Sequence, residues 1–263
     1  MINLTEMMKG KFAEWKEMKE RYRFMVKPWL ILVTLYTVSI SAILRANFSY
    51  KDDMDRILRG RKGWDNFGRY LTQLLSNFIH GDRYLMDISP LPQLLAVLLV
   101  ALSGIITVYI ITEKKKFSLL SFAALIPLGI SPYFLHCLSY KYDPPYMALS
   151  VFASIIPLLF YKKPRLVYIV TVVLGSLVMC TTYQASSGIF PMLVVLLCFK
   201  WWNSKEKEIC GIVEFAGVSA IGYLAGLGIF EIFMPPKGSA LDYVSVSMVS
   251  LDRLFPTIVS NMY

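Results

Sequence analysis

Two adjacent acids followed by arginines form the cluster with the most evident chemical potential in this sequence. Its members are Asp52, Asp53, Arg56, Arg59 and Arg69. Adjacent carboxylates raise one another's pKa, which leaves one of them suited to accept a proton from a hydroxyl. Arginines bind phosphate in a bidentate manner and stabilise the charge on a phosphate as it leaves. The cluster therefore predicts sugar transfer from a lipid-phosphate donor.

A second interpretation of the same cluster is purely structural. Acids and arginines three or four residues apart form ion pairs along a solvated helix, and the arginines then contact lipid headgroups. Spacing alone does not separate this interpretation from the catalytic one.

Further polar and aromatic residues follow at positions predicted to share the same membrane face. They are Trp64, Tyr142, Asp143 and Gln184. Aromatic rings stack on sugars, and carboxylate and amide groups bind sugar hydroxyls, so these residues are candidates for sugar or acceptor binding. Tryptophan and tyrosine also anchor helices at membrane interfaces, and that role stays open for Trp64 and Tyr142.

The composition indicates which elements position these residues. Hydrophobic residues make up 56% of the 263-residue chain and charged residues 17%, against roughly 45–50% and 25% in soluble domains. The apolar residues form long blocks, which predicts an all-α, polytopic membrane protein. Most of the lysines and arginines behind the net charge of +9 lie at the ends of these blocks. In that position they orient helices in a membrane, so the charge predicts membrane topology and no nucleic-acid partner.

About seven transmembrane helices are predicted. They cover residues 28–44, 91–112, 117–138, 147–161, 166–182, 188–202 and 209–234. Residues 1–27 predict an interfacial amphipathic helix, because apolar residues recur on one face and lysines and arginines occupy the rest. The transmembrane domain, 28–234, contains a long first loop, 45–90, with expected helices over 52–60 and 66–80. Residues 235–263 predict an outer segment of a truncated membrane domain.

Basic residues are concentrated in alternate connections between these blocks. The positive-inside rule then favours a cytoplasmic N-terminus, an outer first loop and an outer C-terminus in a bacterial cell membrane. The first loop itself runs against this trend, because it holds many basic residues.

Several segments resemble the bacterial glucosyl transferase family of serotype-converting O-antigen enzymes. The resemblance rests on residues 50–56, Gly63-Trp64, Gly68-Arg69, 87–93, 139–143 with Met147-Ala148, and 182–185. It implies a C-type glycosyltransferase fold with catalytic acids in the first outer loop. It also implies undecaprenyl-phosphate-linked glucose as the donor and a cell-envelope polysaccharide or lipid-linked glycan as the acceptor.

The leading hypothesis is thus a lipid-phosphate-sugar-dependent hexosyltransferase. Asp52 or Asp53 acts as the base, Arg56 with Arg59 or Arg69 holds the donor phosphate, and Asp143 contributes to sugar or acceptor binding. No cofactor is indicated, although outer carboxylates offer oxygen ligands that a divalent metal would accept. The alternatives are a transporter or flippase subunit and an inactive, truncated glycosyltransferase fragment.

Overall fold

The computed structural model describes residues 25–50, 52–81, 84–113 and 117–237, with a few isolated positions after residue 252. Helices connected by loops and turns make up this part of the chain, and it contains no strand. The prediction of an all-α protein is confirmed. The interfacial helix predicted over 1–27 and the outer segment predicted over 235–263 lie almost entirely outside the described residues.

The helices follow one another along the chain with short connections, apart from the long loop after α2. The first segment, Met25–Ser39, continues into α2 (Ser41–Ala46). The long loop contains α3 (Asp53–Arg59), the 3-10 turn η1 (Asp65–Phe67) and α4 (Tyr70–His80). The remaining elements are α5 (Leu91–Thr112), α6 (Leu119–Ile130), α7 (Pro132–Leu138), α8 (Pro144–Ile155), η2 (Ile156–Phe160), α9 (Arg165–Thr182), η3 (Gln184–Gly188), α10 (Ile189–Ser204) and α11 (Ile209–Phe233).

Four helical segments are long and apolar enough to cross a membrane: α5, α9, η3 with α10, and α11. The pair α6 and α7 forms a fifth candidate, bent by 52°. The segments Met25–Ser39 and Pro144–Phe160 are apolar but shorter. The protein is therefore a polytopic helical membrane protein, and the predicted total of seven spans stays a prediction.

The bend between α6 and α7 follows from two residues at the junction. The Ser131 side chain accepts a hydrogen bond from the backbone N–H of Phe134 at 3.3 Å, as a helix N-cap does. Pro132 follows at the start of α7, where its missing N–H is tolerated. The bent pair is thus two capped helices and not a continuous rod.

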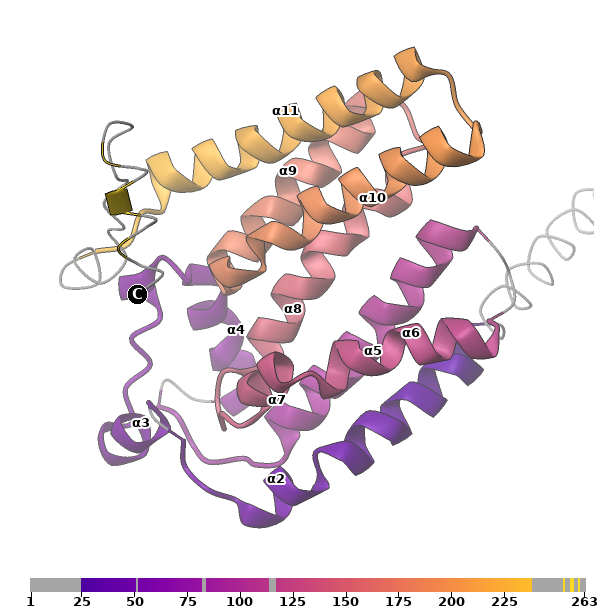
Figure 1. Ribbon diagram of the computed structural model, residues 1–263. Coiled ribbons are helices and arrows are strands. Elements are labelled where there is room, and N and C mark those ends of the chain that lie inside the picture. Colours follow the sequence, from indigo (N-terminus) through magenta and orange to yellow (C-terminus); the bar gives the residue numbers. More distant parts are fainter. Residues whose placement is uncertain are drawn as a thin grey trace, which may run out of the picture.

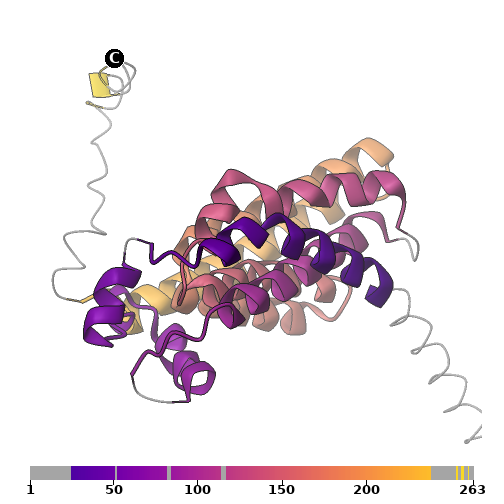
Figure 2. The same ribbon diagram turned by 90° about the horizontal axis from the view of Figure 1, so that it is seen from below.

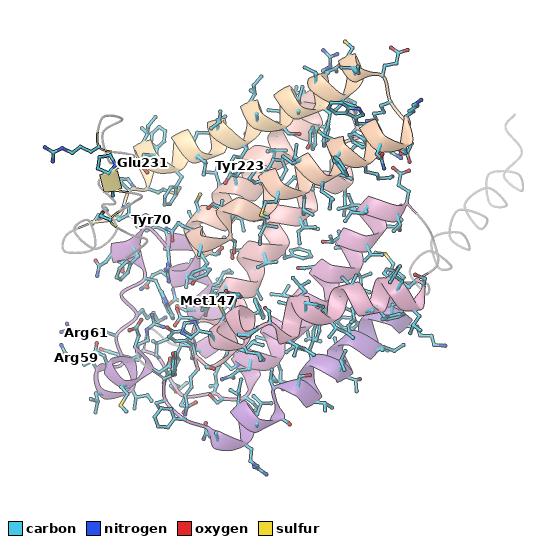
Figure 3. The ribbon with its side chains drawn as sticks, in the orientation of Figure 1. Arg59, Arg61, Tyr70, Met147, Tyr223 and Glu231 are labelled. Atoms are coloured by element: carbon cyan, nitrogen blue, oxygen red, sulfur yellow. The ribbon has the colours of Figure 1, made fainter. Side chains whose placement is uncertain are left out.

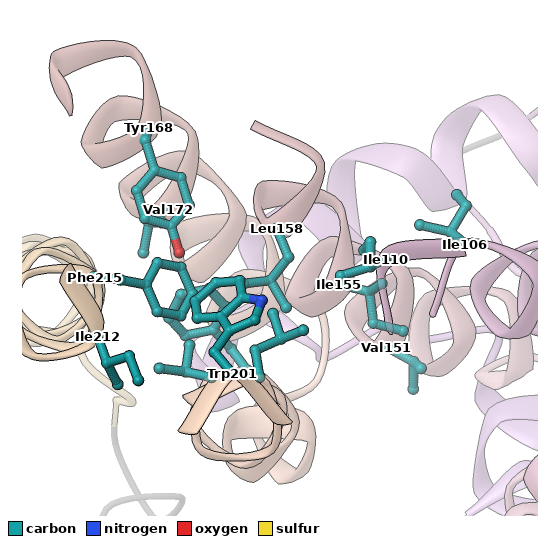
Figure 4. Packing of buried hydrophobic residues seen from close by; sticks show 13 residues of the cluster. Ile106, Ile110, Val151, Ile155, Leu158, Tyr168, Val172, Trp201, Ile212 and Phe215 are labelled. Carbon is teal, nitrogen blue, oxygen red and sulfur yellow. The ribbon is translucent and has the colours of Figure 1, made fainter. Parts of the chain in front are cut away.

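The core of the bundle is formed by large apolar side chains from five helices. Figure 4 shows Trp201 and Phe215 packed together with Tyr168 and Val172, which brings α9, α10 and α11 into contact. A second cluster joins Leu32 and neighbouring residues of the first segment to α5, α6 and α8. Because lipid is as apolar as these side chains, their close van der Waals packing, and not their removal from water, holds the helices together.

The helices α9 and α11 approach each other closely at a glycine. A Cβ atom on Gly226 would lie 2.6 Å from the Cβ of Ser176. Small residues at this crossing let the two backbones pack tightly, as is common between membrane helices.

Successive long segments run in opposite directions, so alternate connections meet at the same end of the bundle (Figure 1). One end holds α3, α4, the 139–143 connection, η3 and the C-terminal end of α11, and we call it the loop end. Figure 2 shows α3 and α4 at the same end from a second direction. The segments predicted to share a membrane face thus lie together.

The two helices predicted within the first loop have different outcomes. The helix expected over 52–60 is confirmed as α3, and Gly60 ends it in the left-handed conformation with φ 61°. The helix expected over 66–80 is interrupted at Gly68, which has φ 71°. The prediction of one continuous helix is wrong because Gly68 packs against Met234 and Phe230 at the end of α11, a contact distant in sequence.

Candidate functional site

A cleft of about 500 Å³ lies at the loop end of the bundle. Its walls come from α3, the η1 region, the 139–143 connection, α8 and the residue after α9. The lining residues are Asp52, Arg56, Trp64, Phe67, Arg69, Tyr140, Asp143, Met147 and Tyr183. Five of the nine predicted site residues are among them: Asp52, Arg56, Arg69, Trp64 and Asp143.

Asp52 presents an exposed carboxylate to this cleft from the N-terminal end of α3. Its side chain makes no capping hydrogen bond to the helix, so the carboxylate is available to a ligand. Its negative charge acts on Arg69 and Tyr140 across the cleft. Among the acids of α3, Asp52 has the position that a proton acceptor for a bound hydroxyl requires.

Asp53 points into the protein instead, and its exposed fraction is 0%. Its Oδ2 atom accepts hydrogen bonds from the backbone N–H of Lys141 at 3.0 Å and of Tyr50 at 3.2 Å. Burial raises the pKa of Asp53 to about 6, and these two hydrogen bonds oppose the rise. Asp53 therefore ties α3 to the 139–143 connection and does not line the cleft.

A buried network fixes Arg56 in the wall of the cleft. Arg56 forms an ion pair with Asp143, and the side chains are 13% and 7% exposed. The other carboxylate oxygen of Asp143 accepts a hydrogen bond from Trp64 Nε1 at 2.7 Å. The guanidinium of Arg56 also lies 4.4 Å from the centroid of the Trp64 ring. Arg56, Trp64 and Asp143 thus form one rigid unit.

Arg69 forms the second cationic group of the cleft and is held differently. Its guanidinium lies 4.9 Å from the ring centroid of Tyr183, and its Nε donates to Gln184 Oε1 at 3.4 Å. Burial is the main cause that lowers the pKa of Arg69, and the negative charge of Asp143 opposes the decrease. Arg69 remains a cation, since arginine does not deprotonate in proteins.

Gln184 supports Arg69 without lining the cleft itself. Its Nε2 donates to the backbone carbonyl of Phe67 at 2.9 Å. The amide therefore joins the start of η3 to the η1 turn and orients the guanidinium of Arg69 between them. The structure thus shows Gln184 supporting Arg69, and its predicted contact with sugar stays a prediction.

Besides Asp53 and Gln184, two more predicted site residues, Arg59 and Tyr142, lie outside the cleft. Arg59 is 62% exposed and pairs with Asp55 at 2.7 Å on the outer side of α3, and Figure 3 shows Arg59 and Arg61 pointing away from the bundle. For Arg59, the geometry matches the structural interpretation of a solvated ion pair. Tyr142 is 2% exposed and packs in a small core with Trp64 and Tyr146 beneath the cleft.

Four residues of the cleft are not among the nine site residues predicted from the sequence: Phe67, Tyr140, Met147 and Tyr183. For three of them the sequence contains an indication of a role in the site. Tyr140 and Met147 belong to segments that resemble the glucosyl transferase family, and Tyr183 directly follows an apolar block that ends at the loop end. Nothing in the sequence indicates that Phe67 belongs to the site, because its spacing matches the apolar face of the helix predicted over 66–80, which the structure interrupts at Gly68. Burial raises the pKa of Tyr140 to about 12, so its hydroxyl stays protonated and can donate a hydrogen bond.

Within the described ranges, no group of three or more histidine, cysteine, aspartate or glutamate side chains is arranged to hold a metal ion. The cleft instead combines one accessible carboxylate with two guanidinium groups and aromatic walls. This arrangement suits a ligand that has an anionic group and a ring with hydroxyls.

Comparison with known proteins gives one family and one relative. Residues 41–263 match the family described as Glucosyl transferase GtrII. The chain is also 26% identical over 248 residues to a protein of Salmonella phage P22 described as an uncharacterized 55.3 kDa protein in the gtrB 5′ region. That match covers 91% of the chain and 49% of the relative, so the chain spans about half the length of the curated relative. No solved structure matches the chain.

Proposed function

This chain belongs to the glucosyl transferase GtrII family, and from that premise we propose that it transfers a glucosyl group at the loop end of its bundle. The donor is a polyprenyl-phosphate-linked glucose, and the acceptor is a cell-envelope glycan such as an O-antigen polysaccharide or its lipid-linked form. The loop end faces outward from a bacterial cell membrane.

One observation carries this proposal: Asp52 and Arg56 of the α3 region line the same cleft as Arg69, which lies between η1 and α4. Asp52 supplies a base, and the two arginines supply positive charge. Because the cleft lies at the ends of membrane-spanning helices, a donor can keep its polyprenyl chain in lipid while its phosphate and sugar enter the cleft.

The transfer then follows from the properties of these groups. Asp52 accepts the proton of the acceptor hydroxyl, and the hydroxyl oxygen attacks the anomeric carbon of the glucosyl group. The bond between that carbon and the phosphate oxygen breaks, and its electron pair stays on the departing polyprenyl phosphate. Arg56 and Arg69 stabilise the added negative charge on this phosphate.

The other residues of the cleft orient the reactants. Asp143 holds Arg56 by an ion pair and Trp64 by a hydrogen bond. The rings of Tyr140 and Tyr183 are half-buried and offer surfaces on which a sugar ring can stack, whereas Trp64 is buried beneath Arg56. We assign Asp143 to positioning, which refines its expected role in sugar binding.

The proposal is tested by transfer from polyprenyl-phosphate-glucose to O-antigen polysaccharide with the purified full chain in lipid nanodiscs. Asp52→Asn removes the base, so we expect kcat to fall by roughly 10²–10⁴-fold. Asp55→Asn is the matched control, because Asp55 lies on the same helix, is 63% exposed and pairs with Arg59 away from the cleft. Wild-type rates in Asp52→Asn would show that another group acts as the base.

A further inference from the structure

A second cavity of about 190 Å³ lies next to the cleft at the loop end. It is formed where the end of α2 meets the start of α5 and the 139–143 connection. Its polar lining includes Asn47, Ser89, Gln93 and Lys141, and Phe48 stands at its side with a ring that is 66% exposed. None of its lining residues belongs to the first cleft.

Gln93 contributes to this cavity a side-chain amide whose oxygen lacks a hydrogen-bond donor among the described residues. The residue is 4% exposed, and its Nε2 donates to the backbone carbonyl of Tyr140 at 3.0 Å. This bond fixes the amide orientation, because the opposite orientation would place two oxygens against each other. The Oε1 atom is buried and has no hydrogen-bond partner within the part of the chain that the structure describes.

A buried acceptor without a partner is unfavourable, and since Gln93 lines the cavity, a ligand that enters it and donates to this amide oxygen would remove that cost. A phosphate dianion has no proton to donate to Gln93 Oε1, whereas a sugar hydroxyl both donates and accepts hydrogen bonds. The exposed ring of Phe48 adds a surface for stacking on a sugar. The volume is also below the roughly 300–1,000 Å³ of pockets for drug-sized ligands, which suits a single sugar unit.

The two cavities share the 139–143 connection as part of their lining. Tyr140 lines the first cleft and Lys141 lines the second cavity. Lys141 is held there by its ion pair with Asp87 at 2.7 Å and by its backbone hydrogen bond to Asp53. Because consecutive residues line the two cavities, an acceptor glycan of several units that enters the first cleft is the kind of ligand that could extend to the second.

We propose that the second cavity binds one sugar unit of the acceptor glycan, adjacent to the unit whose hydroxyl receives glucose. This inference rests on the proposed function, because it treats the first cleft as the site of the donor. It assigns Gln93, Ser89 and Phe48 to acceptor recognition.

The test measures KM separately for polyprenyl-phosphate-glucose and for O-antigen polysaccharide, with the full chain in nanodiscs. Gln93→Met removes the acceptor atom, and we expect the KM for the polysaccharide to rise at least tenfold while the KM for the donor stays unchanged. Gln73→Met is the matched control, since Gln73 also has a buried Oε1 without a partner among the described residues and lines neither cavity. A rise in the donor KM alone, or no change in either KM, would overturn the proposal.

Two further variants keep the test decisive if Gln93→Met does not fold. Phe48→Ala changes an exposed side chain and Ser89→Ala removes one hydroxyl, so both preserve the helices. Each is expected to raise the KM for the polysaccharide at least threefold without changing that for the donor, and unchanged values in both would contradict the inference.

The failure of the proposed function has a different signature. If wild-type protein transfers no glucose, polysaccharide binding is measured directly by saturation-transfer NMR. Signals in the wild type that disappear in Phe48→Ala and Gln93→Met would support the second cavity as a sugar site even then. Absence of wild-type signals would overturn it.

Discussion

The carboxylate of Asp53 is buried between two backbone N–H groups that come from segments far apart in sequence. Its neighbour Asp52 lies at the edge of the cleft, because consecutive helical residues point about 100° apart. A step of one residue along the helix thereby separates two acids of identical chemistry into a group available to a ligand and a group that joins α3 to the 139–143 connection.

The buried acid makes stability depend on pH in a defined direction. Burial raises the pKa of Asp53 from 3.8 to about 6 in the folded protein. The folded state therefore holds this proton more tightly than the unfolded state, and the resulting stabilisation is present below pH 4 and lost as pH rises through 6. Relative to Asp53→Asn, the free energy of unfolding of the wild type should fall by about 2–3 kcal/mol between pH 4 and pH 7.

This difference is measured by chemical denaturation of both proteins in detergent at several pH values. The other titrating groups are common to both proteins and cancel in the comparison. A wild-type-minus-variant difference that stays constant from pH 4 to pH 7 would contradict the assignment of Asp53.

The two arginines of α3 should differ strongly in their effect on stability. Arg56→Gln leaves the buried carboxylate of Asp143 without its cation, so we expect the free energy of unfolding to fall by about 3–5 kcal/mol. Arg59→Gln breaks a pair that is more than half exposed, and the expected loss is below about 1 kcal/mol. Denaturation monitored by circular dichroism separates these values, and equal losses would show that the Asp143 pair is not buried in solution.

At the scale of elements, the η1 turn depends on the C-terminal end of α11, the longest helix in the part of the chain that the structure describes. The backbone N–H of Lys237, just after α11, donates to the carbonyl of Asn66 at 2.8 Å. A Cβ on Gly68 would lie 2.8 Å from the backbone oxygen of Met234 and 3.0 Å from the ring of Phe230. The end of α11 thus supports the turn that presents Arg69 to the cleft.

Gly68→Ala should disturb this support, whereas Gly63→Ala tests backbone strain alone. Both glycines have positive φ, at 71° and 66°, but a Cβ on Gly63 meets nothing within 4 Å. We expect Gly63→Ala to cost about 1–2 kcal/mol. We expect Gly68→Ala to cost more and to lower glucosyl transfer, because Arg69 moves with the turn.

Thermal unfolding and transfer rates of the two variants check this prediction. Equal stability and equal transfer in Gly63→Ala and Gly68→Ala would mean that the contact with α11 has no role.

The helices were largely predictable because their signals are local. Long apolar runs predict the bundle helices, and Gly60 and Gly81 mark the ends of α3 and α4 in the left-handed conformation. The interruption at Gly68 was not predictable in this way, because the reason for it lies in residues 230 and 234.

At the scale of the whole molecule, the site is assembled from contacts that cross most of the chain. Trp64 and Asp143 are 79 positions apart, Arg56 and Asp143 are 87, and Arg69 and Gln184 are 115. The charge pattern along the sequence indicated that these segments share one face of the membrane. It contained no information on which side chains meet there, so Arg59 and Tyr142 were predicted as site residues although neither lines the cleft.

The proposed orientation of the bundle is testable by chemical labelling. After replacement of the four native cysteines by alanine, Arg59→Cys introduces a thiol on α3 at the loop end. Lys163→Cys introduces one in the connection between η2 and α9, which lies at the other end of α9 from the loop end. Both parent side chains are exposed. We expect a membrane-impermeant maleimide to label Arg59→Cys in intact cells and Lys163→Cys only after permeabilisation. The reverse pattern would invert the topology.

The ion pair of Arg56 with Asp143 has a consequence for turnover on the proposed function. A donor phosphate that binds Arg56 competes with a carboxylate that is already in place and cannot diffuse away. Part of the attraction for phosphate is therefore cancelled, and the spent polyprenyl phosphate is held less tightly than two unpaired arginines would hold it. When polyprenyl phosphate dissociates, the ion pair between Asp143 and Arg56 forms again. We therefore expect the product to dissociate faster than it would from a pocket in which neither arginine is paired with an acid.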